Sequence, residues 1–158
     1  FEVFIVDAVT VKGDVVSSSL IRERIKNGIV DDVKDYLGRH FSIDGNVIHG
    51  RKNGEKIGIR TANLEVNHDM VLPKSGVYLT DTIVDNRTYK SVTNIGSNPT
   101  FNGKGVNIET HIIDFHGDLY GSKIEVVFLK RKREERAFGS TTELKAQIMD
   151  DIKNRLEL

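Results

Sequence analysis

The sequence predicts a mainly β fold, in which a closed antiparallel barrel is followed by a C-terminal helix and preceded by a short helical segment. Between Phe41 and Leu129, short runs of β-forming residues alternate with turns rich in Gly and Asn. Such a succession of strands is typical of a barrel, which closes on itself and leaves no exposed edge. After Ser140 the apolar residues recur at helical spacing, and two stretches before Phe41 carry helix start and stop signals.

Bulk composition narrows the function classes. The chain has 158 residues, 38% of them hydrophobic, which is enough for one good core. It carries 23 basic and 23 acidic residues, so no net field attracts nucleic acid or a membrane surface. Cysteine is absent, which excludes disulfides and fits a reducing cytoplasm. No apolar run approaches the roughly 18 residues of a membrane span, and no signal peptide is visible. We therefore expect a cytoplasmic protein without nucleic-acid or membrane partners.

The N-terminal segment is expected to be a remnant of a larger module. Phe1–Val6 is rich in β-formers and predicts a buried strand separated from its sheet, as if the chain were the C-terminal piece of a longer protein. The run Ser17-Ser18-Ser19 offers an N-cap for a helix through Asn27, which Gly28 ends. A second short helix stops at Gly38, and its inner face comprises Val33, Tyr36 and Leu37. The segment has too few apolar residues for a core of its own.

The barrel strands are predicted from runs bounded by turn residues. Asp85-Asn86-Arg87 is a plausible hairpin turn between two of them. The expected strands are Phe41–Ile48, Gly76–Val84, Tyr89–Ile95, Ile108–Phe115 and Lys123–Leu129.

The final helix has a clear start signal, because Ser140 and Glu143 form a capping box. One apolar stripe follows at helical spacing, and we expect it to pack on the core rather than on a partner. The stripe consists of Leu144, Ile148, Ile152 and Leu156.

The stretch from Gly50 to Leu64 is the strongest candidate for chemistry. Its three glycines, Gly50, Gly54 and Gly58, allow positive φ and a close approach of backbone N–H groups to an anion. Thr61 and Asn63 follow at a spacing that places both side chains on one face of a strand. Two neutral oxygens suit Mg²⁺, which shares phosphate oxygens with its protein ligands. The stretch predicts a nucleotide-phosphate loop with a metal site behind it; an ordinary Gly-rich surface turn is the alternative.

Glu109 is the candidate catalytic acid or base. It lies in an alternating strand, and near a barrel mouth it could accept a proton from a hydroxyl that attacks a phosphate. A solvated or salt-bridged strand glutamate is the alternative. The basic run Lys130–Arg133 is followed at once by Glu134 and Glu135, which favours a solvated junction over a nucleic-acid site. The common phosphate-loop, dinucleotide and zinc-protease motifs are absent.

Several separated motifs together resemble the riboflavin kinase family over residues 41–158. They are Gly58–Asn63, Asn94–Phe101, Glu109–Phe115, Gly117–Gly121 and Arg133–Phe138, in the family's order and at roughly its spacing. Before them, Val16–Arg22 resembles the Ser-Ser-Thr-x-x-Arg motif in the nucleotidyltransferase half of bacterial bifunctional FAD synthetases. The resemblance implies two parts: residues 1–40, a remnant of the FMN adenylyltransferase module, and 41–158, a riboflavin kinase domain.

The resemblance implies a Greek-key barrel that transfers the γ-phosphate of ATP to the ribityl 5′-hydroxyl of riboflavin, giving FMN and ADP with the help of Mg²⁺. By position, Thr61 and Asn63 correspond to the metal ligands and Glu109 to the general base. The implied nucleotide-binding residues are Gly50, Gly54, Lys56, Gly58, Thr61, Ile112, Asp114 and Tyr120, and the implied flavin-binding residues are Arg133, Arg136 and Phe138. An N-terminal adenylyltransferase module is implied in the parent chain, and no adenylyltransferase activity is expected from residues 1–40.

Three positions depart from the family pattern. Arg60 stands where proline is usual, and Asn53 and Glu55 stand where basic residues are common. An acid beside a triphosphate weakens nucleotide binding, so we expect a modest enzyme. The alternatives are a flavin- or nucleotide-binding regulatory module with weakened or lost kinase activity, and a structural tail that binds neither ligand.

Overall fold

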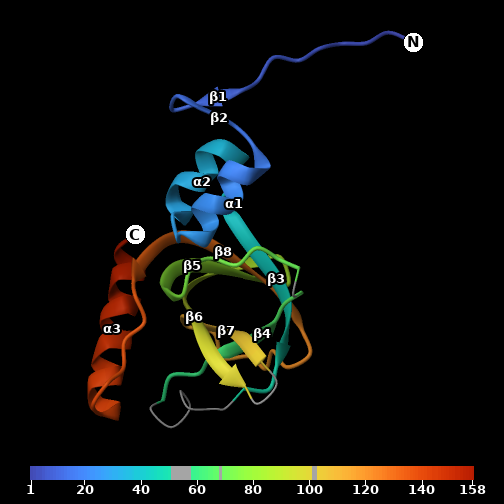
Figure 1. Ribbon diagram of the computed structural model, residues 1–158. Coiled ribbons are helices and arrows are strands. Elements are labelled where there is room, and N and C mark those ends of the chain that lie inside the picture. The colour runs from blue at the N-terminus through green and yellow to red at the C-terminus, as the bar shows by residue number, and fades with distance from the viewer. Residues whose placement is uncertain (51–57, 68, 101–102) are drawn as a thin grey trace.

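The computed structural model describes residues 1–50, 58–67, 69–100 and 103–158, with the side chains of 97–105 left aside (Figure 1). Its central feature is a closed antiparallel barrel with the strand order β3-β4-β7-β6-β5-β8. The strands are β3 (Phe41–Ile48), β4 (Ala62–Glu65), β5 (Gly76–Val84), β6 (Arg87–Thr100), β7 (Gly103–Ile112) and β8 (Lys123–Arg133). The neighbours β8-β5-β6-β7 form a Greek key, because the last strand returns beside the first of three consecutive ones. The predicted fold class is confirmed.

The predicted hairpin turn has two residues rather than three. Val84 pairs with Arg87, so Arg87 already belongs to β6. Asp85 and Asn86 have φ of +48° and +62°, the left-handed values that a two-residue hairpin with the right twist requires. At the same end of the sheet, β7 stops at Ile112, opposite Ser91 of β6, and not at Phe115, since Asp114 has φ of +58° and breaks the extended backbone.

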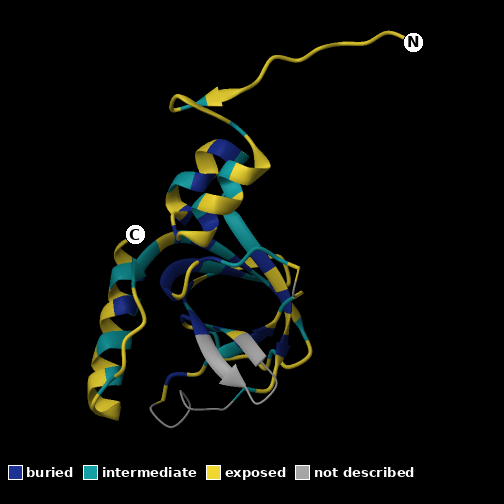
Figure 2. Ribbon diagram, viewed as in Figure 1, coloured by how far each residue is buried: buried dark blue, intermediate teal, exposed yellow. Residues whose placement is uncertain are grey.

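The interior of the barrel is partly polar. Five hydroxyl side chains from β5, β6 and β7 are fully buried: Thr80, Thr82, Ser91, Thr93 and Thr110. They hydrogen-bond to one another, with Thr80 at 2.8 Å from both Ser91 and Thr93, and Thr93 at 2.9 Å from Thr110. Apolar residues fill the rest of the core, among them Ile43, Tyr78, Ile108, Ile124 and Phe128. Figure 2 shows this burial concentrated on the barrel strands.

Two helices, α1 (Ser18–Lys26) and α2 (Val30–Leu37), confirm the predicted helices of the N-terminal segment. Ser17 caps α1 by accepting a hydrogen bond from the Leu20 N–H at 3.2 Å, and Gly38 ends α2 with φ of +70°. The segment does not form a core of its own: Val30 of α2 belongs to the barrel core, and α2 contacts β3 and β8.

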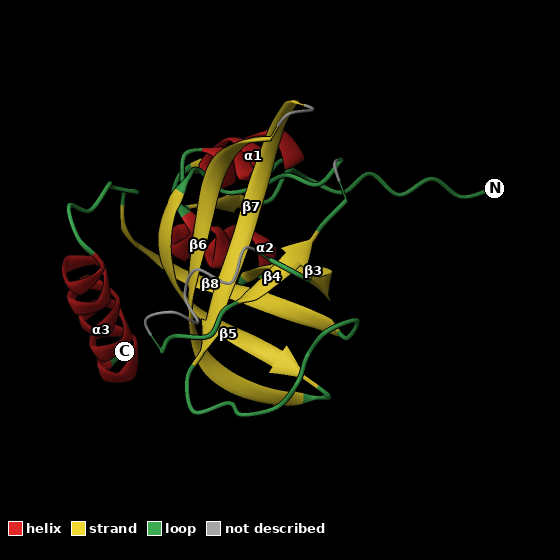
Figure 3. Ribbon diagram, turned by 90° about the horizontal axis from the view of Figure 1, so that it is seen from below, coloured by secondary structure: helices red, strands yellow, loops and turns green. Residues whose placement is uncertain are grey.

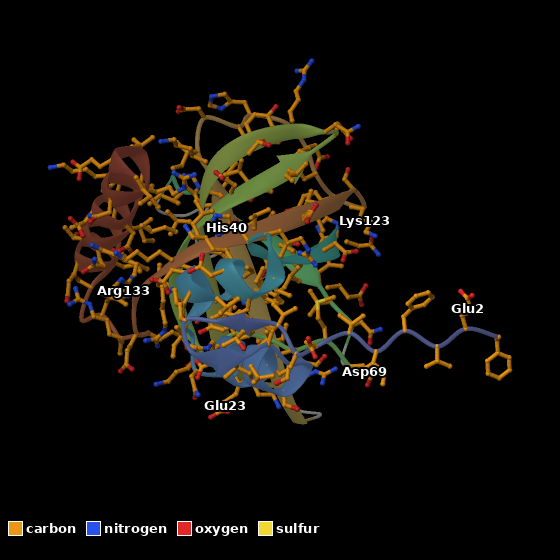
Figure 4. The ribbon with its side chains drawn as sticks, turned by 90° about the horizontal axis from the view of Figure 1, so that it is seen from above. Glu2, Glu23, His40, Asp69, Lys123 and Arg133 are labelled. Carbon is orange, nitrogen blue, oxygen red and sulfur yellow. The ribbon has the colours of Figure 1, made fainter. Side chains whose placement is uncertain are left out.

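The predicted buried strand Phe1–Val6 is wrong. These residues carry no strand and are exposed, and in Figures 1 and 4 they extend away from the barrel, with Glu2 far from it. An apolar run forms a buried strand only when neighbouring strands accept its hydrogen bonds, and no such neighbour is described here. The short hairpin β1 (Thr10–Val11) and β2 (Asp14–Val15) follows it.

The C-terminal helix α3 (Thr141–Glu157) lies outside the barrel beside β5 and β6 (Figure 3). Ser140 caps it, accepting from the Glu143 N–H at 3.2 Å. Its apolar stripe packs on the barrel only in part: Leu144, Ile148 and Ile152 are half-buried, whereas Leu156 is 51% exposed.

The buried residues of α3 are the charged Asp151 and Arg155. Arg155 donates through Nε to the Thr80 carbonyl at 2.7 Å and forms an ion pair with Asp81. Asp151 forms an ion pair with Arg133 of β8 at 2.8 Å. Buried ion pairs and half-buried apolar contacts therefore attach this helix to the barrel.

Candidate active site

Two cavities adjoin on the barrel wall. The first has a volume of about 430 Å³ and the second about 280 Å³. Thr61 and His111 line both, so the cavities meet at these two side chains. The first cavity is also lined by Val47, Arg60, Ala62, Thr110, Ile112, Phe115, His116, Gly117, Asp118, Leu119 and Tyr120. The second cavity is lined by side chains of β8, of the segment that joins β8 to α3, and of α3 itself, among them Arg133, Phe138 and Leu144.

Strand register brings together the three polar residues on which the sequence prediction rested. β4 pairs with β7 so that Asn63 lies directly opposite Glu109, and Thr61 comes just before β4 begins. Directly opposed residues project to the same face of a sheet. Asn63 is 8% exposed, and Glu109 is half-buried in the wall of the second cavity, which Thr61 also lines. Asn107 donates a hydrogen bond to the Glu109 carboxylate and so restrains it.

Gly50 makes a close approach that only glycine permits. A Cβ atom at position 50 would lie 2.1 Å from Asn63 Nδ2 and 2.7 Å from Asn63 Oδ1, so the backbone passes directly over this side chain. Gly58 has φ of +78°, as expected of a loop glycine. Gly54 and Lys56 lie outside the described residues, as do Asn53 and Glu55, so their predicted roles stay predictions.

The donor set beside Gly50 fits a hard divalent cation. The Thr61 hydroxyl and the Asn63 amide oxygen are neutral oxygen donors, which suit a metal that keeps water and shares phosphate oxygens. The described residues contain no cluster of three or more His, Asp or Glu side chains. Thr61 and Asn63 carry no negative charge, so the positive charge of a cation held by them would be neutralised mainly by the phosphates of a bound nucleotide.

Three residues of β7 and the following turn were predicted to lie near the nucleotide, and two of them, Ile112 and Tyr120, line the first cavity. Tyr120 stacks on His49 with ring centroids 4.0 Å apart. Asp118 holds this turn by accepting from the Tyr120 N–H at 3.0 Å. Asp114 is exposed and lines neither of these cavities, so nothing in the described geometry supports its predicted contact.

The residues predicted to border a flavin gather in the second cavity. The Arg136 guanidinium lies 4.8 Å from the ring centroid of Phe138, and that of Arg133 lies 5.8 Å from it. Asp151 holds Arg133 from α3, and Figure 4 shows Arg133 on the side of the barrel that this helix occupies. Apolar side chains complete the cavity, including Ile59, Val77, Val92, Leu144 and Ile148. A planar aromatic ligand with polar edges suits such a lining.

Sequence reasoning did not identify several polar residues of the second cavity. His111 contacts the Arg60 carbonyl, Asp151 fixes Arg133, and Asn94 donates to the Glu135 carboxylate at 3.2 Å. No local signal marks these pairs, because the partners are far apart in sequence. Only the position of His111 next to Thr110, within the motif Glu109–Phe115, could have drawn attention to it.

The barrel and its joined cavities define the class of the molecule: a small closed β-barrel with two cavities that share the side chains of Thr61 and His111. The model of the family "Flavokinase: Riboflavin kinase" matches residues 37–158. The chain belongs to the riboflavin kinase family, whose members are phosphotransferases that use ATP and typically a divalent metal.

Curated relatives agree with this assignment. The chain is 39% identical over 152 residues to the "Bifunctional riboflavin kinase/FMN adenylyltransferase" of Listeria monocytogenes, covering 96% of this chain and 48% of that protein. It is 37% identical over 137 residues to the protein of the same name from Escherichia coli K12, covering 86% and 44%. The chain thus spans about half the length of the curated relatives it matches.

Solved structures support the fold. A chain from Streptococcus pneumoniae titled "Macrolide-efflux Protein" matches with a TM-score of 0.92 and 32% identity, over 97% of this chain and 50% of that one. The riboflavin kinase of Trypanosoma brucei matches with a TM-score of 0.55 and 22% identity, over 73% and 74%, which shows the fold alone. The name of the streptococcal protein refers to macrolide efflux, and we do not transfer that activity to this chain. None of the helices described for this chain has the length and hydrophobicity needed to cross a membrane.

Proposed function

We propose that this chain transfers the γ-phosphate of ATP to the 5′-hydroxyl of riboflavin, giving FMN and ADP. The observation that carries the proposal is that Thr61 lines both cavities, next to Asn63 and Glu109. A transferase for two substrates needs a place where the donor phosphate and the acceptor hydroxyl meet, and this junction supplies it. Family membership gives the substrates their identity.

The linings favour one arrangement of the substrates. The nucleotide would occupy the first cavity, where Ile112 and Tyr120 offer apolar and aromatic surface. The Gly50 backbone, which passes over Asn63, would lie near its phosphates. The isoalloxazine ring would occupy the second cavity, against Phe138 and the two arginines. The ribityl chain would then extend toward Thr61.

The chemistry follows from positioning and charge neutralisation. The 5′-hydroxyl oxygen bonds to the γ-phosphorus, the bond from that phosphorus to the bridging oxygen breaks, and ADP leaves. Glu109 would accept the hydroxyl proton, and the hydrogen bond from Asn107 would orient its carboxylate. Thr61 and Asn63 would hold Mg²⁺, which when bound neutralises charge on the phosphates.

The binding-module alternative finds no support in the described residues. Arg60, one of the departures from the family pattern, lines the first cavity and brings a cation to its wall. Thr61 lines both cavities and Glu109 lines the second, whereas Asn63 is buried behind them and lines neither.

Three further proposals concern the whole protein. We propose that residues 1–40 belong to an FMN adenylyltransferase module and that the protein is cytoplasmic. We also propose that no nucleic acid or membrane is its partner. The half-length match to bifunctional relatives supports the first of these, the absence of cysteine fits the second, and the balanced charge supports the third.

The direct test is to incubate the protein with riboflavin, ATP and MgCl₂ and to separate the flavins by chromatography with fluorescence detection. We expect FMN to accumulate with ADP in equal amounts, and Glu109→Gln to serve as the matched control that binds without turnover. Binding of riboflavin without FMN formation would instead support the binding-module alternative. Binding of neither riboflavin nor ADP would refute both.

A further inference from the structure

His111 makes a hydrogen bond that determines which of its ring nitrogens carries hydrogen. Its Nδ1 lies 2.7 Å from the backbone carbonyl oxygen of Arg60. A carbonyl oxygen can only accept, so Nδ1 must donate. In the neutral ring this leaves Nε2 without hydrogen. The side chain is half-buried and lines both cavities.

This bond extends the attachment of β4 to β7 beyond the end of the strand pair. The backbone pairing of the two strands ends at Ala62 and Thr110. Arg60 and Thr61 precede β4, so strand pairing does not hold them. The imidazole of His111 reaches past the last pair and holds the peptide that joins Arg60 to Thr61. His111 is itself fixed, because it pairs with Val92 of β6 on its other side.

We propose that His111 is a positioning residue for Thr61: its Nδ1–H, bonded to the Arg60 carbonyl, fixes the orientation of the 60–61 peptide and so places the Thr61 hydroxyl at the junction of the two cavities. The inference rests on the proposed function of Thr61 as a ligand of the metal and phosphates. Without this bond ψ of Arg60 and φ of Thr61 are less restrained, and changes in these two angles that do not compensate each other displace the Thr61 hydroxyl. Loss of alignment by about 1 Å is enough to slow a phosphoryl transfer severely.

The position of the donor distinguishes this role from simple packing. The side-chain nitrogen of asparagine can take the place of His Nδ1, whereas that of glutamine lies one bond further out, near the place of Nε2. His111→Asn therefore keeps the donor and His111→Gln displaces it, although both variants carry the same amide group. They form a matched pair in which only the reach of the donor differs.

We expect His111→Gln to lower kcat about tenfold, the value of one lost hydrogen bond of moderate strength, and to raise the Mg²⁺ concentration needed for half-maximal rate. His111→Asn should restore most of both. Riboflavin affinity and the thermal midpoint should be similar in the two variants, because neither change affects Phe138 or the barrel core. Loss of packing alone would impair both variants alike and would overturn the inference.

Two readouts do not require turnover. The ¹⁵N spectrum of the His111 imidazole in the unmodified protein should show the Nδ1–H tautomer at high pH. In calorimetric titrations with ADP, Mg²⁺ should increase affinity in the unmodified protein and in His111→Asn, but much less in His111→Gln. An Nε2–H tautomer, or the same metal effect in all three proteins, would overturn the inference. Absence of FMN from the unmodified protein would refute the proposed function instead, and the tautomer and the metal effect on ADP would still decide the role of His111.

Discussion

Asp151 connects the stability of the C-terminal helix to the second cavity, and its replacement should disturb both. Its carboxylate side chain is 1% exposed and accepts from Arg133, whose Nη2 lies 2.8 Å from Oδ2. Gln147 donates a further hydrogen bond to it at 3.2 Å. In Asp151→Ala the arginine keeps its charge in a half-buried place and loses its partner.

The magnitude follows from the burial of the two partners. Removing one partner of a fully buried ion pair costs about 3–5 kcal/mol. Arg133 is 19% exposed in its side chain, so water recovers part of this loss, and we expect a decrease of about 2 kcal/mol in the free energy of unfolding. For a domain of this size that corresponds to a fall of about 4–8 °C in Tm. Riboflavin affinity should fall as well, because Arg133 is no longer held beside Phe138.

The assay compares thermal unfolding by circular dichroism with riboflavin binding by fluorescence quenching. Lys153→Ala is the control on the same helix, since Lys153 and Glu157 are 3.9 Å apart and 73% and 64% exposed. Such an exposed i,i+4 pair contributes about 0.3–0.5 kcal/mol, so the control should melt within about 2 °C of the unmodified protein. If Asp151→Ala is too unstable to purify, Asp151→Asn retains an acceptor and should show a smaller effect. Equal melting of Asp151→Ala and Lys153→Ala would refute the reasoning.

Three other replacements test the remaining roles. Glu109→Gln should lower turnover by about 10²-fold or more with little effect on riboflavin or ADP affinity, because a general base acts in the transition state; an equal loss of binding in titrations would contradict this. Thr61→Ala should raise the Mg²⁺ concentration needed for half-maximal rate, and an unchanged metal titration would exclude the ligand role. Burial raises the pKa of the Tyr78 phenol above its ordinary 10.0, so the stability it contributes is complete below about pH 10 and is lost as the pH rises toward the raised value. In urea unfolding at about pH 9 and about pH 11, Tyr78→Phe should lose less stability between the two than the unmodified protein; equal losses would contradict the assignment.

The barrel was predictable because runs of β-forming residues alternate with turns that contain glycine or asparagine, although β6 and β8 extend beyond their predicted ends, to Thr100 and Arg133. The hydrophobic period identified β3 and β5 with their correct bounds, and the turn at Asp85 and Asn86 followed from residues that tolerate positive φ. The end of β7 was misplaced, because apolar residues continue through Phe115 while the backbone of Asp114 has already left the strand.

The packing of α3 was not predictable from its apolar stripe. Hydrophobic periodicity scores Asp151 and Arg155 as solvent-facing, although they are the buried residues of the helix. Their partners, Arg133 and Asp81, come from distant strands, and a single sequence does not indicate such pairings.

The candidate site divides in the same way. Thr61 and Asn63 are separated from Glu109 by more than 40 positions, yet the resemblance to the riboflavin kinase family implied their proximity, and the register of β4 against β7 explains it. The contact of His111 with Arg60 involves a main-chain oxygen, which every residue possesses, so the sequence contains no signal for it.

The buried hydroxyls of β5, β6 and β7 constrain how this barrel can be altered. Each of these side chains serves as a partner for its neighbours, so exchanging Thr93 alone for valine leaves Thr80 and Thr110 each without one of its partners in a dry interior, at a cost of about 1–3 kcal/mol. Exchanging Thr80 and Thr93 together removes both members of one contact and should cost less than the sum of the single exchanges. Replacement of these buried hydroxyls by methyl groups is therefore expected to be tolerated better when hydrogen-bonded partners are replaced together.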